Sequence, residues 1–193
     1  RFNNKEVGDE RYFVSASPYT GDVSKNYWSD STEVENGKEY VVRMYVHNNA
    51  ASNLKLTAKD VKAYVVLPTT TGTEITVSGK ITSTNAKPTA VWDETHFKSK
   101  NGEKFNLAYV DGTAKYYNNA GTFNLTTSVF TNKGTLLGYE KMDGNIPGCI
   151  QYSGYLTFHV KAQFASKPDL SIQKEVKLLG ADTWSEQIKA KSG

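Results

Sequence analysis

The stretch EYVVRMYVHNNA, from Glu39 to Ala50, constrains the fold of this chain more than any other segment. Its alternate residues are apolar, namely Tyr40, Val42, Met44 and Val46. The residues between them are Arg43, Tyr45 and His47. A period of two is that of a β-strand with one buried face. The pattern therefore predicts a scaffold strand, and we expect its apolar face to pack against residues 156–164 across a β-sandwich.

Further segments with strand character follow along the chain, and turn-forming residues separate them. Alternation or apolar runs mark residues 61–67, 74–82, 89–98 and 150–164. Asp111-Gly112, between residues 105–110 and 115–117, is a typical hairpin signal. No segment sustains a period of 3.6 residues with helix caps, so no long helix is expected. These patterns predict an all-β fold, an antiparallel β-sandwich of the immunoglobulin-like or jelly-roll-like kind, over residues 1–165.

Composition excludes several classes of partner. The formal net charge is +3, but the 23 basic and 20 acidic residues are interspersed, so no basic stripe for nucleic acid is present. No segment approaches the roughly 18 continuous apolar residues of a membrane span. Cys149 is the only cysteine, which rules out a disulfide within this sequence.

Aromatic residues gather in the long segment Ser17–Glu35, which the sequence predicts to be a loop. Tyr19, Tyr27 and Trp28 fit two interpretations. They form either a small satellite core or an exposed patch that contacts a ligand such as a sugar or a peptide. The adjacent Tyr116 and Tyr117 offer a second stacking platform. If the domain has a function of its own, we expect it in the loops, above all in Ser17–Glu35.

No sequence motif indicates catalysis, a metal site or a cofactor. A nucleophile elbow, a phosphate-binding glycine loop and a HExxH pair are absent. His47, His96 and His159 are far apart in sequence and are expected to act independently. Asp93 and Glu94 point to opposite faces of one strand. Paired carboxylates need only proximity in space, so a cell-wall hydrolase remains the alternative from another functional class.

The last part of the chain, residues 166–193, differs from the rest. After a short linker, the run PDLSIQKEV from Pro168 to Val176 resembles the opening strand of the conserved-repeat β-sandwich domains found along large prokaryotic surface proteins. GDERYFV (residues 8–14) and YVHNNA (residues 45–50) are similar to the N-terminal sandwich module of such proteins. The resemblance implies an extracellular, wall-attached bacterial protein whose chain continues beyond residue 193.

Lys174 lies in the apolar register of that final strand. In related Gram-positive adhesin and pilin sandwiches, a lysine in this register forms a crosslink to an Asn or Asp side chain, and the resemblance extends that role to Lys174. The other interpretation is an edge lysine whose stem lies on the core while its amine reaches water.

The sequence therefore predicts a non-enzymatic structural or adhesive module that contacts other surface-protein domains or ligands on host or neighbouring cells. A carbohydrate-binding module is the alternative within the same compartment.

Overall fold

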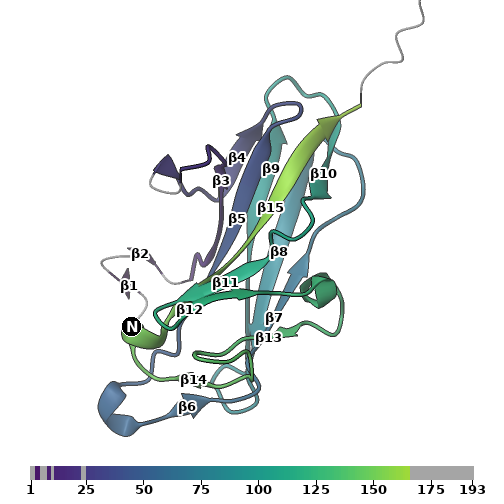
Figure 1. The fold of residues 1–193 in the computed structure, drawn as a ribbon. Coiled ribbons are helices and arrows are strands. Elements are labelled where there is room, and N and C mark those ends of the chain that lie inside the picture. Colours follow the sequence, from purple (N-terminus) through teal and green to yellow (C-terminus); the bar gives the residue numbers. More distant parts are fainter. Residues whose placement is uncertain (1–2, 5–7, 10, 23–24, 166–193) are drawn as a thin grey trace, which may run out of the picture.

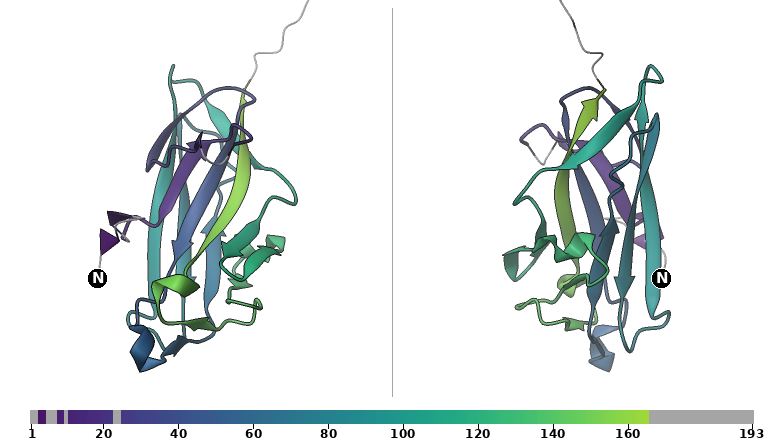
Figure 2. Two further views of the ribbon diagram at one scale, coloured as in Figure 1. Left: turned by 60° about the vertical axis from the view of Figure 1, so that its left-hand side comes forward. Right: turned by 90° about the vertical axis from the view of Figure 1, so that its right-hand side faces the viewer.

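The computed structural model describes residues 3–4, 8–9, 11–22 and 25–165, and these form a β-sandwich (Figures 1 and 2). The first sheet has the order β12-β11-β15-β5-β3, and β10 also pairs with β15. Its strands are β3 (Val14–Pro18), β5 (Glu39–Val46), β10 (Phe105–Tyr109), β11 (Lys115–Asn118), β12 (Gly121–Asn124) and β15 (Gly154–Phe164). The second sheet has the order β13-β7-β8-β9-β4. Its strands are β4 (Ser31–Val34), β7 (Lys62–Val66), β8 (Glu74–Thr82), β9 (Ala90–Ser99) and β13 (Thr135–Leu136).

Smaller elements complete the described part of the chain. Two short antiparallel pairs are β1 (Asn3–Asn4) with β2 (Gly8–Asp9), and β6 (Thr57–Ala58) with β14 (Ile146–Pro147). The 3₁₀ helices η2 (Ser52–Leu54), η3 (Thr127–Phe130) and η4 (Ile150–Tyr152) are single turns. Among the described residues, no helix has the length and apolar character needed to cross a membrane. The expected all-β sandwich is thus confirmed, whereas residues 166–193 and Lys174 lie outside the described residues.

The strand β5 lies inside the first sheet, between β15 and β3. Our expectation that its apolar face packs against residues 156–164 across the sandwich is wrong, because β5 and β15 are hydrogen-bonded neighbours, with Val42 opposite Phe158. Both strands send their apolar parity into the space between the sheets. There the side chains meet the second sheet, as in the edge-to-face contact of Tyr40 with Phe97, whose ring centroids are 5.9 Å apart.

The Asp111-Gly112 segment also differs from expectation, because β10 and β11 do not form a hairpin with each other. Both strands pair with β15, antiparallel to it and one after the other along the same edge. Between them the chain makes a short excursion, in which the backbone N–H of Val110 still donates to the carbonyl of His159 at 3.0 Å. A turn dipeptide here serves as a bulge, since the chain leaves the edge and rejoins it without reversing.

The segment expected to be one long loop, Ser17–Glu35, contains part of two strands. Ser17 and Pro18 belong to β3, and Ser31–Val34 form β4, which pairs parallel with β9 in the second sheet. Only Thr32 and Val34 of β4 are buried. An alternating pattern with two buried positions is too short to be recognised as a strand in the sequence. The true connection, residues 19–30, crosses from one sheet to the other.

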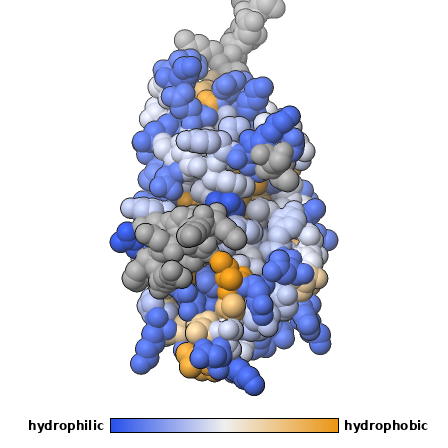
Figure 3. Space-filling view, turned by 90° about the vertical axis from the view of Figure 1, so that its left-hand side faces the viewer, coloured by the Kyte–Doolittle hydropathy of each residue, from blue (hydrophilic) through white to orange (hydrophobic). Residues whose placement is uncertain are grey.

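The surface turned toward the viewer in Figure 3 is mostly hydrophilic, and its hydrophobic residues form small patches toward the end of the sandwich that carries β6 and β14. A mostly polar exterior of this kind is typical of a sandwich in which one parity of each strand faces water.

At Gly79 in β8 the two sheets approach each other closely. A methyl group at this position would lie 2.7 Å from the Cε atom of Met44 and 2.8 Å from a Cγ atom of Val14. Met44 and Val14 are opposite each other in the first sheet. The absence of a side chain on β8 therefore lets two side chains of the first sheet fill the centre of the core.

We predict that Gly79→Ala destabilises the domain by about 1–3 kcal/mol, because the added methyl group overpacks this contact and the valine cannot move aside. Chemical denaturation would measure the shift in midpoint. Ser78→Ala, one residue away on the same strand and facing outward, is the control and should change stability by less than about 0.5 kcal/mol. Equal stability of the two variants would contradict the packing described for β8.

Candidate functional site

A groove of about 300 Å³ lies on the outer face of the first sheet. The groove arises because the outward-facing residues of the central strands have large side chains. The exposed face of a solvated sheet usually has polar side chains instead. β5 contributes Val41 and Arg43, and β15 contributes Tyr155, Thr157 and His159. The remaining lining residues are Tyr19, Asn26, Trp28 and Tyr117. The volume is at the lower end of the range for small-molecule sites.

The connection between β3 and β4 is held against the sheet at both ends. Tyr19 donates its backbone N–H to the carbonyl of Glu39 at 2.9 Å, and Ala16 and Ser29 exchange two backbone hydrogen bonds of 2.9 Å. The backbone N–H of Tyr27 donates to the hydroxyl of Ser17 at 2.9 Å. Ser17 is fully buried although it lies on the outward parity of β3, so its small side chain allows the connection to pack directly on the sheet.

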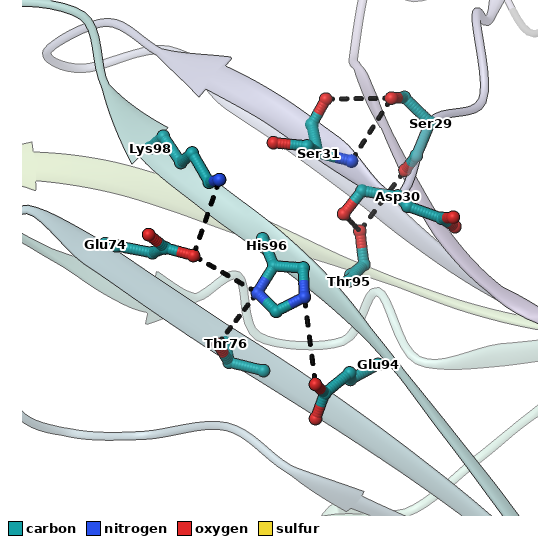
Figure 4. Close-up of polar contacts among 9 residues, drawn as sticks. All are labelled: Ser29, Asp30, Ser31, Glu74, Thr76, Glu94, Thr95, His96 and Lys98. Carbon is teal, nitrogen blue, oxygen red and sulfur yellow. Dashed lines mark hydrogen bonds and ion pairs between the residues drawn. The ribbon is translucent and has the colours of Figure 1, made fainter.

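The second sheet holds the end of this connection (Figure 4). The hydroxyl of Thr95, which is fully buried in β9, lies 3.2 Å from the carbonyl oxygen of Ser29 and 3.1 Å from that of Asp30. The backbone N–H of His96 donates to the carbonyl of Asp30 at 2.7 Å. The backbone is therefore fixed at the two residues that follow Trp28, and this holds Trp28 against the sheet.

Arg43 lies at the centre of the groove, with aromatic rings on its guanidinium group. Its Cζ atom is 4.1 Å from the ring centroid of Trp28 and 5.2 Å from that of Tyr155. The Nε atom is buried and has no hydrogen-bond partner among the described residues. Burial lowers the pKa of Arg43, and the interaction with Tyr155 raises it. An arginine remains charged at neutral pH in any case, so the groove contains a desolvated positive charge.

Glu39, on the same strand as Arg43, pairs with a histidine of the groove. Glu39 lies 2.5 Å from Nδ1 of His159 through its Oε1 atom, and this contact occupies the acid. The ring of Tyr19 packs on the imidazole of His159, with the ring centroids 4.4 Å apart. The result is a row of Tyr19, His159 and Glu39 at one end of the groove, whereas Trp28, Arg43 and Tyr155 stack beside it.

The aromatic residues expected from sequence divide between groove and solvent. Tyr19 and Trp28 line the groove, as does Tyr117. Tyr27 is 80% exposed and is not part of the lining, so it is unsuited to act with the other rings. Tyr116 cannot serve as a stacking platform, because it is fully buried against Gly154. Burial, the largest cause, raises the pKa of its hydroxyl.

Arg43, Tyr155 and His159 are the lining residues that sequence patterning assigned to scaffold strands rather than to a site. The available signal was that both strands carry bulky residues on their outward parity. His96, by contrast, belongs to the outer face of the second sheet (Figure 4), where Nδ1 lies 3.0 Å from the Thr76 hydroxyl and Nε2 lies 3.7 Å from Glu94. Across the described part of the chain, no group of three His, Cys, Asp or Glu residues is arranged to hold a metal ion.

A wider hollow of about 790 Å³ lies among loops at the β14 end of the sandwich. Its lining is largely polar and includes Asn119, Glu140, Lys141 and Asp143. Its charged side chains are typical of solvated turns. Small-molecule sites are instead lined mostly by apolar side chains. The aromatic groove is therefore the stronger candidate.

No family model, no curated protein and no solved structure matches this chain. The chemistry of the groove is therefore the basis on which a function can be inferred.

We predict that Arg43→Met changes the free energy of unfolding by less than about 1 kcal/mol. The two cation–π contacts, worth about 0.5–1 kcal/mol each at exposed sites, are lost, but removal of a desolvated charge compensates. A methionine also keeps favourable contacts with both rings. Thermal and chemical unfolding would measure this, with Lys80→Met as the control, because Lys80 lies over the ring of Tyr64 at 4.7 Å and is exposed. A loss above about 2 kcal/mol would make Arg43 a structural residue.

Proposed function

We propose that this domain is a non-enzymatic adhesive module of a bacterial surface protein and that it binds carbohydrate in the groove of the first sheet. The observation that carries the proposal is the convergence of Tyr19, Trp28, Tyr117 and Tyr155 around one groove from separate elements. Aromatic rings with a polar tip provide a large apolar contact and retain hydrogen-bonding capacity at the edge.

The lining matches the two-sided chemistry of a sugar ring. A pyranose presents C–H groups on its faces, which pack on aromatic rings, and hydroxyl groups around its edge. The polar groups of the groove are few and distributed among the rings, as in Asn26, Thr157 and His159. A small number of fixed polar groups on an apolar floor is the usual composition of a site that orients a small ligand.

An extended peptide is a less suitable ligand. The commonest way for a sheet to bind a peptide is to add it as a strand along an open edge. This groove lies instead over β5 and β15, which are interior strands of the first sheet. Its floor therefore offers side chains, and the backbone groups of these strands are already paired with each other.

The hydrolase alternative lacks its essential groups at this site. Glycoside hydrolysis normally uses a pair of carboxylates on either side of the scissile bond. The described residues that line the groove include no Asp or Glu. Glu39 is adjacent, but it is hydrogen-bonded to His159. Binding without turnover is the function that this arrangement supports.

The extracellular location is proposed from the resemblance of PDLSIQKEV, GDERYFV and YVHNNA to surface-protein modules. In such a protein the domain would display its groove to glycans of a host or neighbouring cell, while adjacent domains of the same protein carry it away from the wall. The crosslink at Lys174 would belong to the following domain.

We predict that Trp28→Ala and Tyr155→Ala each weaken glycan binding by about 2 kcal/mol, or roughly thirtyfold, since aromatic anchors at the centre of a site contribute most of its affinity. A glycan array would identify the ligand, and calorimetry would give the affinities. Trp92→Ala is the matched control, because Trp92 is 70% exposed and lies on the opposite sheet. This variant should bind the glycan as tightly as the unmodified protein does. An array without hits, or affinity that survives both groove substitutions, would refute the proposal.

A further inference from the structure

The positive charge of the groove indicates the charge of the ligand. Arg43 contributes a full positive charge, and none of the described residues lining the groove carries a carboxylate. No described residue forms an ion pair or a side-chain hydrogen bond with the guanidinium group. An uncompensated charge in an apolar site is costly to maintain, which indicates that an anionic partner is supplied from outside the chain.

The aromatic neighbours of Arg43 also restrict the direction from which an anion can bind. Trp28 lies over the guanidinium group at 4.1 Å from its ring centroid, and Tyr155 lies within 5.2 Å. The N–H donors of arginine lie in the plane of the group, in a fork that matches the two oxygens of a carboxylate. Rings that hold the plane fixed reduce the entropy lost when both hydrogen bonds form, because the donors are already oriented.

Asn26 adds a second group without a partner. Its side-chain oxygen is buried, lines the same groove and has no hydrogen-bond partner among the described residues. A buried amide normally satisfies its hydrogen-bonding groups. An acceptor oxygen needs a donor, so a ligand that carries both a hydroxyl group and an anionic group would complete Asn26 and Arg43, which line the same groove.

We infer that the groove selects a sugar bearing a carboxylate, such as a uronic acid or a sialic acid, and that Arg43 binds this carboxylate while the sugar ring packs on the surrounding aromatic side chains. The inference depends on the proposed carbohydrate-binding function and narrows it to acidic glycans. Glu39 contributes by holding His159, which lines the groove, in place.

The test compares acidic glycans with matched neutral ones. An array would present oligosaccharides containing glucuronic, galacturonic, mannuronic or sialic acid, each beside its carboxyl-reduced counterpart. Calorimetry on the best pair would follow, at low and at high salt. The acidic member should bind roughly ten- to hundredfold more tightly, as expected for a hydrogen bond to a charged group. Salt should weaken only the acidic member appreciably.

Variants at position 43 separate charge from shape. Arg43→Met should reduce the preference for the acidic member over its neutral counterpart to less than about threefold. Arg43→Lys keeps the charge but loses the planar fork, so an intermediate preference is expected. Lys80→Met, on the opposite sheet, should leave the preference unchanged, and circular dichroism would confirm that each variant is folded.

The outcomes distinguish this inference from the function on which it depends. Equal or tighter binding of the carboxyl-reduced glycans, with loss of binding in Trp28→Ala, would overturn the acidic preference and leave the carbohydrate-binding function standing. An acidic preference that persists in Arg43→Met would also overturn it. Absence of binding to every glycan of both kinds would overturn the proposed function itself. The array arms further decide between uronic and sialic acids as the source of the carboxylate.

Discussion

The pairing of β5 with β15 is the interaction on which the rest of this structure depends. Their register runs from Val46 opposite Gly154 to Glu39 opposite Lys161, and each strand also pairs with others of the first sheet. The inward parity of the two strands supplies much of the core, and their outward parity supplies the floor of the groove. Because side chains alternate with a period of two, a slip of one residue would exchange the two faces and destroy core and site together.

Local patterning predicted the strands well and their partners less well. β8 was expected at residues 74–82 and occupies those residues, because its alternation is long and regular. The pairing of β5 with β15 was misassigned. Two amphipathic strands have the same alternating sequence pattern whether they pair within one sheet or pack against each other from two sheets. The hairpin predicted at Asp111-Gly112 was wrong for a similar reason. A turn dipeptide determines a local bend, whereas the partner of the next strand depends on the whole sheet.

The groove shows the same limit at the level of a site. Trp28 was recognisable from sequence as a candidate ligand-contacting aromatic of a loop, whereas Arg43 was assigned to a scaffold strand. Its neighbours lie far away in the chain, Trp28 in the connection to β4 and Tyr155 in β15. Only the register of β3, β5 and β15 brings the three together. An arginine that stacks on rings and has no acid beside it is recognisable as a site only once those neighbours are known.

The strand directions of the first sheet have a mechanical consequence. β3 and β15 both run antiparallel to β5, so the start of β3 at Val14 and the end of β15 at Phe164 lie toward opposite ends of the sheet. Tension between these two points runs along the strands, and it loads the hydrogen bonds of β5 simultaneously, in shear, whereas a peeling geometry would break them one at a time. A domain pulled at these two points resists extension, and the groove lies on the same strands that bear the load.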